Sequence, residues 1–251
     1  MRDAEIDEMA RLEDTHWWFV GKRILVASAL GSVAGGRALD VGCGTGRLVT
    51  ELGRRWRCYG TDVSRTALAH SLRRGCDGLV NAAAERLPFR AGSFVLVTAL
   101  DVIEHADDDR AVLAEICRVL VRDGTLVVSV PAVPALWSAH DVALGHRRRY
   151  TRRTLRAALE SAGFIVVSMS YTNTAIFPIA AAVRLLSRLR PPAPGSESDM
   201  FPVPAPLNRF LIALYRIEAM LIRHVSLPIG VSLLAVAKRS DAPRTAGPGS
   251  D

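Results

Sequence analysis

The sequence predicts an α/β fold in which a mostly parallel sheet carries helices on both faces. Apolar strand-like segments and amphipathic helical segments alternate from about Arg37 to Val130, which is the pattern of such a sheet. The first apolar segment runs directly into three alternating glycines, Gly42, Gly44 and Gly46. An acid at Asp62 ends the next apolar segment. Together these features indicate a sheet edge that binds a nucleotide-like ligand.

The glycine loop is the strongest chemical signal in the chain. Glycine lacks Cβ, so it can adopt positive φ and let backbone N–H groups approach a ligand, while the following helix presents the positive end of its dipole. The third glycine of a dinucleotide-binding loop would fall on Arg47, where it is needed for close packing of helix on strand. The loop therefore disfavours NAD. Taken alone, it is also consistent with a simple strand-to-helix turn.

The spacing Gly-x-Gly-x-Gly after Asp40 resembles motif I of the class I S-adenosylmethionine (SAM) methyltransferases. Residues 84–89, 100–105 and 124–130 resemble, in order, that family's segment beside the adenine, its segment after the fourth strand and its fifth strand. The resemblance implies a Rossmann-like, seven-stranded sheet that binds SAM, with Asp62 on the ribose. The implied cofactor-binding residues are Asp40, Gly42, Cys43, Gly44, Gly46, Asp62, Ala84, Glu85 and Asp101.

Three positions depart from the family pattern. The usual adenine-binding acid falls on Ala83, the acid after Phe94 is replaced by Val95, and the turn before the fifth strand reads 122–124 as Arg-Asp-Gly without the usual Pro-Gly-Gly. The departure at Ala83 leaves adenine recognition to backbone groups.

The length of 251 residues fits one large α/β domain. We expect that domain to span 1–240, with cap helices in 1–34, and the small polar residues of 241–251 to form a disordered tail. The four cysteines lack metal-ligand spacing, which suits a reducing compartment. The acidic first residues lack the pattern of a secretory signal, and charges interrupt every long apolar run, so we expect a cytoplasmic protein.

The net charge of +7 favours an anionic partner in general terms, whether phosphate, lipid head group or nucleic acid. Charge alone does not choose among them. The oligomeric state is left open by the sequence.

The elements after the glycine loop follow from capping and periodicity. A helix begins after Asp107, buries the stripe formed by Val112, Ile116, Val119 and Leu120, and ends before Gly124. A second helix is predicted over 151–162, ends at Gly163 and leads into a strand over 164–167. The last strand is placed at 230–237.

A helical insertion over 174–228 precedes this last strand. It is predicted to contain a helix near 179–189, a proline-rich linker and a second helix near 208–223. The linker contains Pro191, Pro192, Pro194, Pro202, Pro204 and Pro206.

Two interpretations of the insertion stay open. One is a helical cap packed on the core or on a second subunit. The other is a peripheral membrane surface, in which apolar side chains alternate with arginines. Its apolar residues would be Phe177, Ile179, Leu185, Leu211, Leu214, Leu221 and Ile222.

The connection after Val130 carries the candidate catalytic groups, because ligands of open α/β sheets bind beyond the carboxyl ends of the strands. His140, with Asp141 beside it in sequence, and His146 are the candidate general bases for an acceptor hydroxyl or amine. The alternative is that either imidazole only holds the loop in shape.

Basic and phenolic side chains follow in the same connection. Arg147, Arg149 and Tyr150 are candidate ligands for an acceptor carboxylate or phosphate. Their alternative is a solvated basic turn, the interpretation that best fits Arg148, Arg152 and Arg153. A zinc site of His140, Asp141 and His146 lacks a nearby fourth ligand, so we expect no metal.

Three aromatics at 17–19 precede the first strand. Trp17 or Trp18 is a candidate substrate lid, and packing at the domain edge is the equal alternative. With the Leu-Trp-Ser-x-His-Asp segment at 136–141 and the Gly-His-x-Arg-Arg-Tyr segment at 145–150, this region resembles a bacterial methyltransferase subgroup associated with cell-envelope glycan or polyprenyl-linked pathways.

The function that the sequence predicts is SAM-dependent methylation of a small-molecule or lipid-linked acceptor, at oxygen. RNA methylation is one alternative, motivated by the basic residues of 146–153, although no separate RNA-binding module is present. A noncatalytic scaffold with a SAM-binding fold, whose insertion binds a membrane or a partner, is the other.

Overall fold

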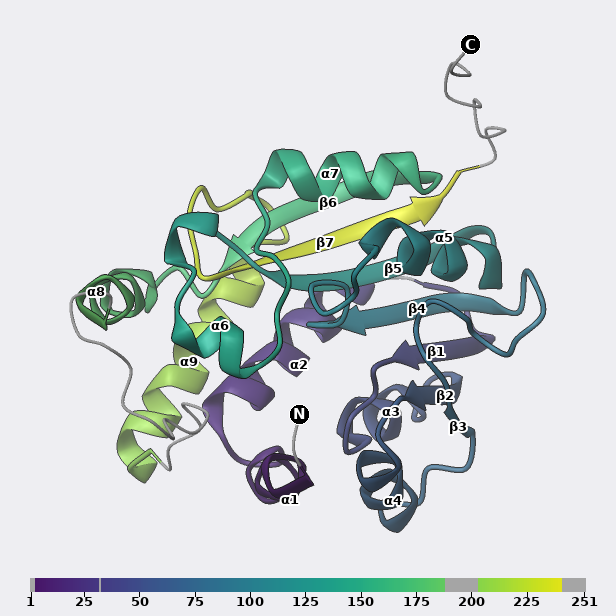
Figure 1. Ribbon diagram of the computed structural model, residues 1–251, viewed down its shortest axis with the longest axis horizontal. Helices are drawn as coiled ribbons and strands as arrows, with labels where there is room; N and C mark the ends of the chain where they lie inside the picture. The colour runs from purple at the N-terminus through teal and green to yellow at the C-terminus, as the bar shows by residue number, and fades with distance from the viewer. Residues whose placement is uncertain (1–2, 32, 188–202, 241–251) are drawn as a thin grey trace.

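The computed structural model describes residues 3–31, 33–187 and 203–240, and the side chains of 185–187 are not among its described parts (Figure 1). The predictions for Leu185, for the tail 241–251 and for four prolines fall outside the described side chains and residues. These prolines are Pro191, Pro192, Pro194 and Pro202.

A seven-stranded sheet forms the centre of the molecule, in the order β3-β2-β1-β4-β5-β7-β6. Strands β1 to β5 pair in parallel, whereas β7 runs antiparallel to both β5 and β6. The predicted seven-stranded, mostly parallel α/β fold is therefore confirmed. The strands are β1 Arg37–Val41, β2 Arg57–Asp62, β3 Leu79–Asn81, β4 Phe94–Leu100, β5 Leu120–Pro131, β6 Phe164–Thr172 and β7 Ser232–Arg239.

Helices cover both faces of this sheet (Figure 1). On one face, α5 and α7 bury Leu113, Ile116, Leu155 and Leu159 in the larger core. On the other, α2, α3 and α9 pack around Leu25, Leu52 and Tyr215. The helices are α1 Asp3–Leu12, α2 Trp17–Leu30, α3 Arg47–Leu52, α4 Arg65–Arg73, α5 Asp109–Val119, α6 Ala139–Ala143, α7 Arg152–Ser161, α8 Phe177–Ser187 and α9 Ala205–Leu221, with a 3-10 turn, η1, at Pro134–Leu136.

The ends of α5 differ from the prediction. Asp108, not Asp107, caps the helix, because its carboxylate accepts the N–H groups of Arg110 and Ala111. The helix ends at Val119 with no glycine, since Leu120 is already extended and begins β5. Gly124 lies inside β5 instead. The predicted stripe on α5 is fully buried.

The α7 region follows the prediction closely. The Thr151 hydroxyl caps the helix by accepting from the N–H of Thr154, and the N–H of Thr151 in turn donates to the Thr154 hydroxyl oxygen. Gly163 has φ of +94° just beyond the helix end. The strand that follows, β6, continues to Thr172 and is longer than predicted.

The helical insertion lies between β6 and β7. Its second helix, α9, starts three residues before the predicted start at 208 because Pro206 occupies its first turn, where a missing N–H has no cost. Pro204 and Pro206 therefore belong to the start of a helix, not to a linker. α9 packs on α2, where Gly21 lets the ring of Tyr215 approach so closely that an added Cβ would lie 2.3 Å from it.

No helix within the described ranges is both long and apolar enough to cross a membrane.

Candidate functional site

The glycine loop after β1 has the backbone that its sequence predicts. Gly42 and Gly46 have φ of +68° and +85°, which residues with a Cβ rarely adopt. A Cβ on Gly42 would lie 2.5 Å from Val102 Cγ2, and one on Gly46 would lie 2.9 Å from the backbone Cα of Ser71. Both positions therefore require glycine for two independent reasons, conformation and space.

Asp62 joins the glycine loop to the end of β2. Gly44 N–H donates to Asp62 Oδ2 at 2.9 Å, and Ser64 N–H donates to Oδ1 at 2.8 Å. The carboxylate is thereby fixed beside the loop, at the carboxyl end of the sheet where nucleotide-like ligands bind in α/β folds.

Asp40 lies one step deeper, within β1. Its carboxyl group is 3% exposed and accepts a 2.6 Å hydrogen bond from Thr98 Oγ1 of the paired position on β4. Burial raises the pKa of Asp40 to about 7, with the neighbouring Glu13 and Asp62 acting in the same direction. Asp40 is thus a buried acid that titrates near neutral pH.

Strained backbone gathers at the same sheet edge. Asp101, Val133 and Asn173 have φ of +54°, +59° and +64°, and they follow the carboxyl ends of β4, β5 and β6. Positive φ in a β-branched residue such as Val133 is uncommon, and such outliers cluster at functional sites. This edge is therefore the candidate site.

Asp101 faces the N-terminal helices. Its carboxylate forms an ion pair with Lys22 of α2, whose ammonium also lies 4.7 Å from the centre of the Trp18 ring. Burial lowers the pKa of Lys22 to about 8. A small pocket beside this pair is lined by Lys22, Leu100, Ser129 and Asn173, among others.

Side chains of α5 form hydrogen bonds with the backbone of residues 84–89, the segment expected beside the adenine. Glu115 accepts the N–H of Leu87 at 2.8 Å, and Arg118 donates to the carbonyl groups of Leu87 and Phe89. Ala84 is half-buried against the larger core, and Glu85 is exposed.

The N-terminal helix α1 covers the glycine loop, through residues that the sequence analysis missed. Glu13, just after α1, accepts a hydrogen bond from Thr45 Oγ1, and Met9 Cε lies 3.1 Å from the position of a Cβ on Gly44. Arg74 of α4 pairs with Glu13 at 3.3 Å and with Asp14 at 2.9 Å. The sequence signal for this contact was the pair of acids at Glu13 and Asp14, together with the basic residues at the end of α4.

The two tryptophans occupy different surroundings. Trp17 packs against Tyr215 of α9, and the backbone N–H of Trp17 donates to Asn208 Oδ1 at 2.8 Å. These contacts favour the packing interpretation. Trp18 lies over Lys22 and so stands closer to the candidate site. Trp18 is the better candidate for contact with substrate.

Asp141 pairs with His146. His146 Nδ1 donates to Asp141 Oδ1 at 2.9 Å, and Arg149 Nε donates to the same oxygen at 2.7 Å. Although burial alone would raise it, these hydrogen bonds hold the pKa of Asp141 well below its usual range. An ionised Asp141 only accepts hydrogen bonds, so Nδ1 carries a proton and, in the neutral form of the imidazole, the lone pair is on His146 Nε2.

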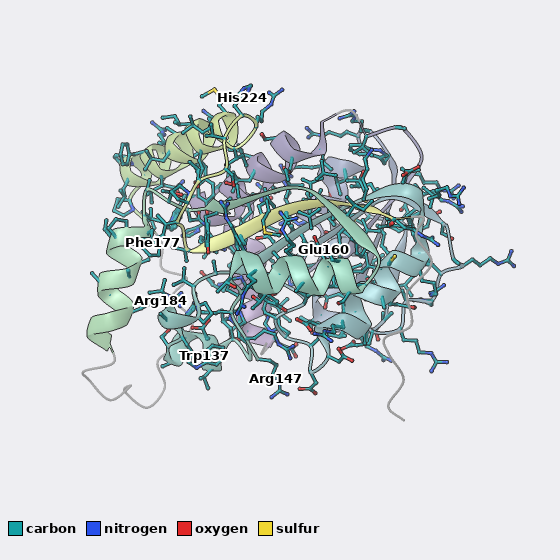
Figure 2. The ribbon with its side chains drawn as sticks, turned by 90° about the horizontal axis from the view of Figure 1, so that it is seen from above. Trp137, Arg147, Glu160, Phe177, Arg184 and His224 are labelled. Carbon is teal, nitrogen blue, oxygen red and sulfur yellow. The ribbon has the colours of Figure 1, made fainter. Side chains whose placement is uncertain are left out.

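Arg184 of α8 also reaches Asp141. Its guanidinium donates to Asp141 Oδ2 at 3.2 Å and to the carbonyl of Leu136 at 3.4 Å, beside the segment that carries Trp137 (Figure 2). The insertion therefore contacts the residue that orients His146.

The remaining sequence candidates of this connection have separate surroundings. His140 is half-buried on α6 and is not the imidazole paired with Asp141. Arg149 is buried and donates to the carbonyl of Ala132, and the Tyr150 hydroxyl donates to Asp109 at 2.6 Å. Both side chains are occupied inside the protein, which favours a role in holding the loop. Arg147 is exposed and pairs with Asp107.

Comparison with known proteins agrees with this geometry. Residues 39–128 match the family described as "Methyltransferase domain". The fold is that of the class I methyltransferases. Among solved structures, a chain of the complex between the Haloferax volcanii Trm112 methyltransferase activator and the protein named there as a methyltransferase has a TM-score of 0.62 at 21% identity, covering 96% of this chain and 95% of that one.

Two further methyltransferases illustrate the range of relatives. The ubiquinone biosynthesis O-methyltransferase of Xanthomonas axonopodis pv. citri (strain 306) is 31% identical over 147 residues, which are 50% of this chain and 60% of that protein. This chain therefore spans less than two thirds of that curated relative. Phosphoethanolamine N-methyltransferase 2 of Haemonchus contortus, in complex with SAM, has a TM-score of 0.58 at 16% identity, covering 88% of this chain and 52% of the other.

In this methyltransferase fold, two functional candidates lie where the sequence suggested only a cofactor segment. Glu104 and His105 follow β4, and the N–H of Arg147 donates to the backbone carbonyl of Glu104 at 2.8 Å. This contact brings His146 beside His105, with ring centres 4.8 Å apart. The adjacent acid and histidine after a strand end were a sequence signal for this cluster. Residue spacing could not predict that His146, about 40 positions away on a loop, would lie beside them.

Proposed function

We propose that the protein transfers a methyl group from SAM to an oxygen of a small-molecule or lipid-linked acceptor. The observation that carries this proposal is the shared location of two groups at one sheet edge. The glycine loop with Asp62 forms the cofactor side, and the Asp141–His146 pair forms the acceptor side. The segment after β4 connects the two sides. Its Val102 side chain lies against Gly42, and the backbone carbonyl of its Glu104 accepts a hydrogen bond from the N–H of Arg147.

The cofactor side fits SAM. The positive-φ glycines leave a surface free of Cβ atoms, and Asp62 stands where a carboxylate can meet a ribose. Asp40, Cys43 and Gly46 complete the loop, and Ala84, Glu85 and Asp101 are assigned to the adenine side. When bound, SAM supplies a methyl group on a sulfonium, which needs alignment with a nucleophile more than it needs further protein chemistry.

The acceptor side supports an oxygen nucleophile. Because Asp141 fixes the tautomer of His146, the imidazole presents a lone pair where the acceptor hydroxyl must lose its proton for transfer to be complete. We assign His146 the activation of that hydroxyl, Asp141 its orientation, and Trp18 and Arg147 contact with the acceptor. His140 is the weaker candidate because it does not pair with Asp141.

A lipid-linked acceptor is favoured by the surface of α9. An exposed apolar stripe on this helix contains Leu207, Phe210, Ile217, Met220 and Leu221. Leu211, Leu214 and Ile222, assigned to the membrane surface from the sequence, are instead half-buried because that side of α9 faces α2 and the core.

Three arginines flank the stripe. Arg209 and Arg216 are seven residues apart on one side of α9, and Arg223 follows in the turn after the helix. Arg209, Arg216 and Arg223 are exposed, and none has a hydrogen-bond or ion-pair partner within 3–31, 33–187 and 203–240. An apolar stripe beside unpaired cations fits the surface of an anionic bilayer. We therefore propose peripheral contact of the insertion with anionic lipid, in line with the cell-envelope glycan and polyprenyl-linked pathways suggested by the 136–150 segments.

The structure lends less support to RNA methylation. Of the basic residues that motivated it, Arg149 is buried, Arg148 donates to the carbonyl groups of Ala106 and Asp107, and Arg152 donates to Ser226. These guanidinium groups are engaged within the protein and do not form an open phosphate-binding surface.

The test is incubation with methyl-labelled SAM and separate envelope, RNA and metabolite fractions. Label in the lipid or metabolite fraction supports the proposal, label in RNA overturns the acceptor class, and SAM binding without transfer to any fraction favours the noncatalytic scaffold. Asp62→Ala should lower SAM affinity in calorimetry, and His146→Ala should lower turnover while SAM affinity is kept. Unchanged turnover in His146→Ala would remove that residue from the reaction.

A further inference from the structure

A buried polar cluster joins the end of β4 to the loop before α7. One carboxylate oxygen of Glu104 and one ring nitrogen each of His105 and His146 lie within 4.8 Å of one another. Glu104 is fully buried, His105 is exposed and His146 is half-buried. The cluster is thus closed on the protein side and open to solvent at His105.

The buried carboxylate of Glu104 lacks the hydrogen-bond partners that a buried charge needs. Neither of its carboxylate oxygens has a hydrogen-bond partner in the described part of the chain, apart from the residue's own backbone amide. The ammonium of Lys22, whose charge acts on Glu104, is paired with Asp101. A buried carboxylate without partners is costly by several kcal/mol, so native proteins pair such groups or let them bind a cation.

Both imidazoles are arranged as ligands. His146 donates its Nδ1–H to Asp141, and a ring N–H of His105 donates to the backbone carbonyl of Gly145. Each ring therefore keeps one nitrogen with a lone pair. Metal-ligating histidines characteristically donate their other N–H to a carboxylate or a backbone carbonyl, which fixes ring orientation and raises ligand basicity.

We propose that Glu104, His105 and His146 bind a divalent transition-metal ion of the Zn²⁺ class, oriented by Asp141. Two imidazoles and one carboxylate are a common donor set for such ions and leave a position open for an oxygen ligand. The role rests on the proposed function and refines it. When the ion is bound, it takes the His146 lone pair, so His146 acts on the acceptor through the ion and not by removing the proton itself. The ion would hold the acceptor oxygen and lower the pKa of its hydroxyl, whose proton would leave to water.

This site differs from the one weighed on sequence grounds. Of His140, Asp141 and His146, only His146 is a ligand here. Asp141 accepts the hydrogen bond from His146 Nδ1 and so orients the ring. The donor atoms lie within 4.8 Å of one another, whereas metal bonds of about 2.1 Å imply a separation of roughly 3.4 Å, so small side-chain rotations bring all three to an ion.

The experiment measures binding of Zn²⁺ alone to the full chain, after removal of bound metal with a chelator. Calorimetry should show one site per chain, and Co²⁺ should give the visible absorption of a nitrogen- and oxygen-ligated ion. Glu104→Gln and His105→Ala should each weaken Zn²⁺ binding at least about 100-fold, and Asp141→Asn should weaken it about 10- to 100-fold. His224→Ala, on the exposed turn after α9 (Figure 2), is the matched control and should bind as the unaltered protein does.

Two outcomes separate this inference from the proposed function. Methyl transfer by the metal-free protein without Zn²⁺ binding would overturn the metal site and leave the transferase standing. Specific Zn²⁺ binding without transfer to any fraction would leave the site standing and overturn the transferase. Binding that persists in Glu104→Gln and His105→Ala variants with native circular dichroism would also overturn the inference.

Discussion

The glycine loop depends on backbone angles that few residues adopt. Gly46 combines φ of +85° with a backbone neighbour 2.9 Å from the position of any added Cβ. Gly46→Ala should therefore displace the loop, destabilise the fold by about 1–3 kcal/mol and weaken SAM binding at least about tenfold. Calorimetry with SAM and thermal unfolding measure both effects.

The control for this substitution is Gly35→Ala. Gly35 has no heavy atom within 4 Å of its added Cβ and has no positive φ. If Gly35→Ala and Gly46→Ala lower SAM affinity equally, the argument from loop geometry fails.

Asp40 makes stability depend on pH. Its pKa is raised by burial from 3.8 to about 7, so the folded state holds a proton that the unfolded state releases. The stability contribution is complete below pH 4, is lost as pH rises towards 7 and is constant above. With about 1.4 kcal/mol per pKa unit, the loss is at most about 4 kcal/mol.

Asp40→Asn lacks this titration. The free energy of unfolding of the variant, minus that of the unaltered protein, should rise between pH 4 and 7 and then level off. Urea denaturation at several pH values measures the difference. A difference that does not change with pH would show that Asp40 is ionised in the folded state throughout.

The roles of single residues could be predicted from the sequence where those roles depend only on neighbouring positions in the chain. Glycines that need positive φ, and an acid at a strand end, leave a signature within a few positions. The pairing of Asp141 with His146 and not with adjacent His140 was beyond sequence reasoning, because it depends on the path of a loop. The same holds for Glu104 and His105, which meet His146 only after the chain has folded.

At the scale of elements, α1 acts as a cover on the glycine loop. Ile6 is its buried apolar side chain, and ion pairs add to its attachment: Arg74 binds Glu13 and Asp14 just after α1, and His70 binds Asp7 at 2.7 Å. Such contacts open at lower free energy than packed cores. Arg74→Ala should therefore increase amide hydrogen exchange in α1 about 10-fold, without changing exchange in the central strands.

Arg11→Ala is the matched control for α1. Among the residues that the structure describes, Arg11 pairs only with Glu8 of its own helix, and its side chain is 76% exposed. Equal exchange in Arg11→Ala and Arg74→Ala would mean that the ion pairs to α4 do not hold the cover closed.

Elements were predicted best where one periodic stripe is buried. The stripe on α5 identified that helix, but its ends were misplaced because three consecutive aspartates, 107–109, offer equivalent caps and β5 begins without a turn. The two helices of the insertion were predicted near their positions. Their orientation was not, since α9 is apolar on two sides and only tertiary packing selects the buried one.

For the whole molecule, the exposed stripe on α9 predicts binding to anionic vesicles. The protein should float with vesicles of phosphatidylglycerol and phosphatidylcholine, and less with phosphatidylcholine alone. Replacing Arg209, Arg216 and Arg223 by Gln removes about 1 kcal/mol each, which is about a 100-fold loss in partitioning at low salt. Leu72→Ser, at an apolar residue 60% exposed on α4, should leave flotation unchanged. Flotation that persists in the arginine variant would contradict the bilayer assignment.

The class of the sheet was predictable because alternating strands and helices permit few topologies. Its number of strands was predicted only from the resemblance to the SAM methyltransferases. The helices of 174–228 break the alternation, yet the last strand was placed at 230–237, two residues from the observed β7.

The place of β7 between β5 and β6 has a consequence for synthesis on the ribosome. Among the seven strands of the sheet, β7 is made after both of its neighbours. Until residues 232–239 leave the exit tunnel, β5 and β6 each present an unpaired edge, and the insertion has no fixed return point. The nascent chain must therefore protect these strand edges until β7 has been translated, so a truncation that removes β7 should aggregate during synthesis and not merely lose stability.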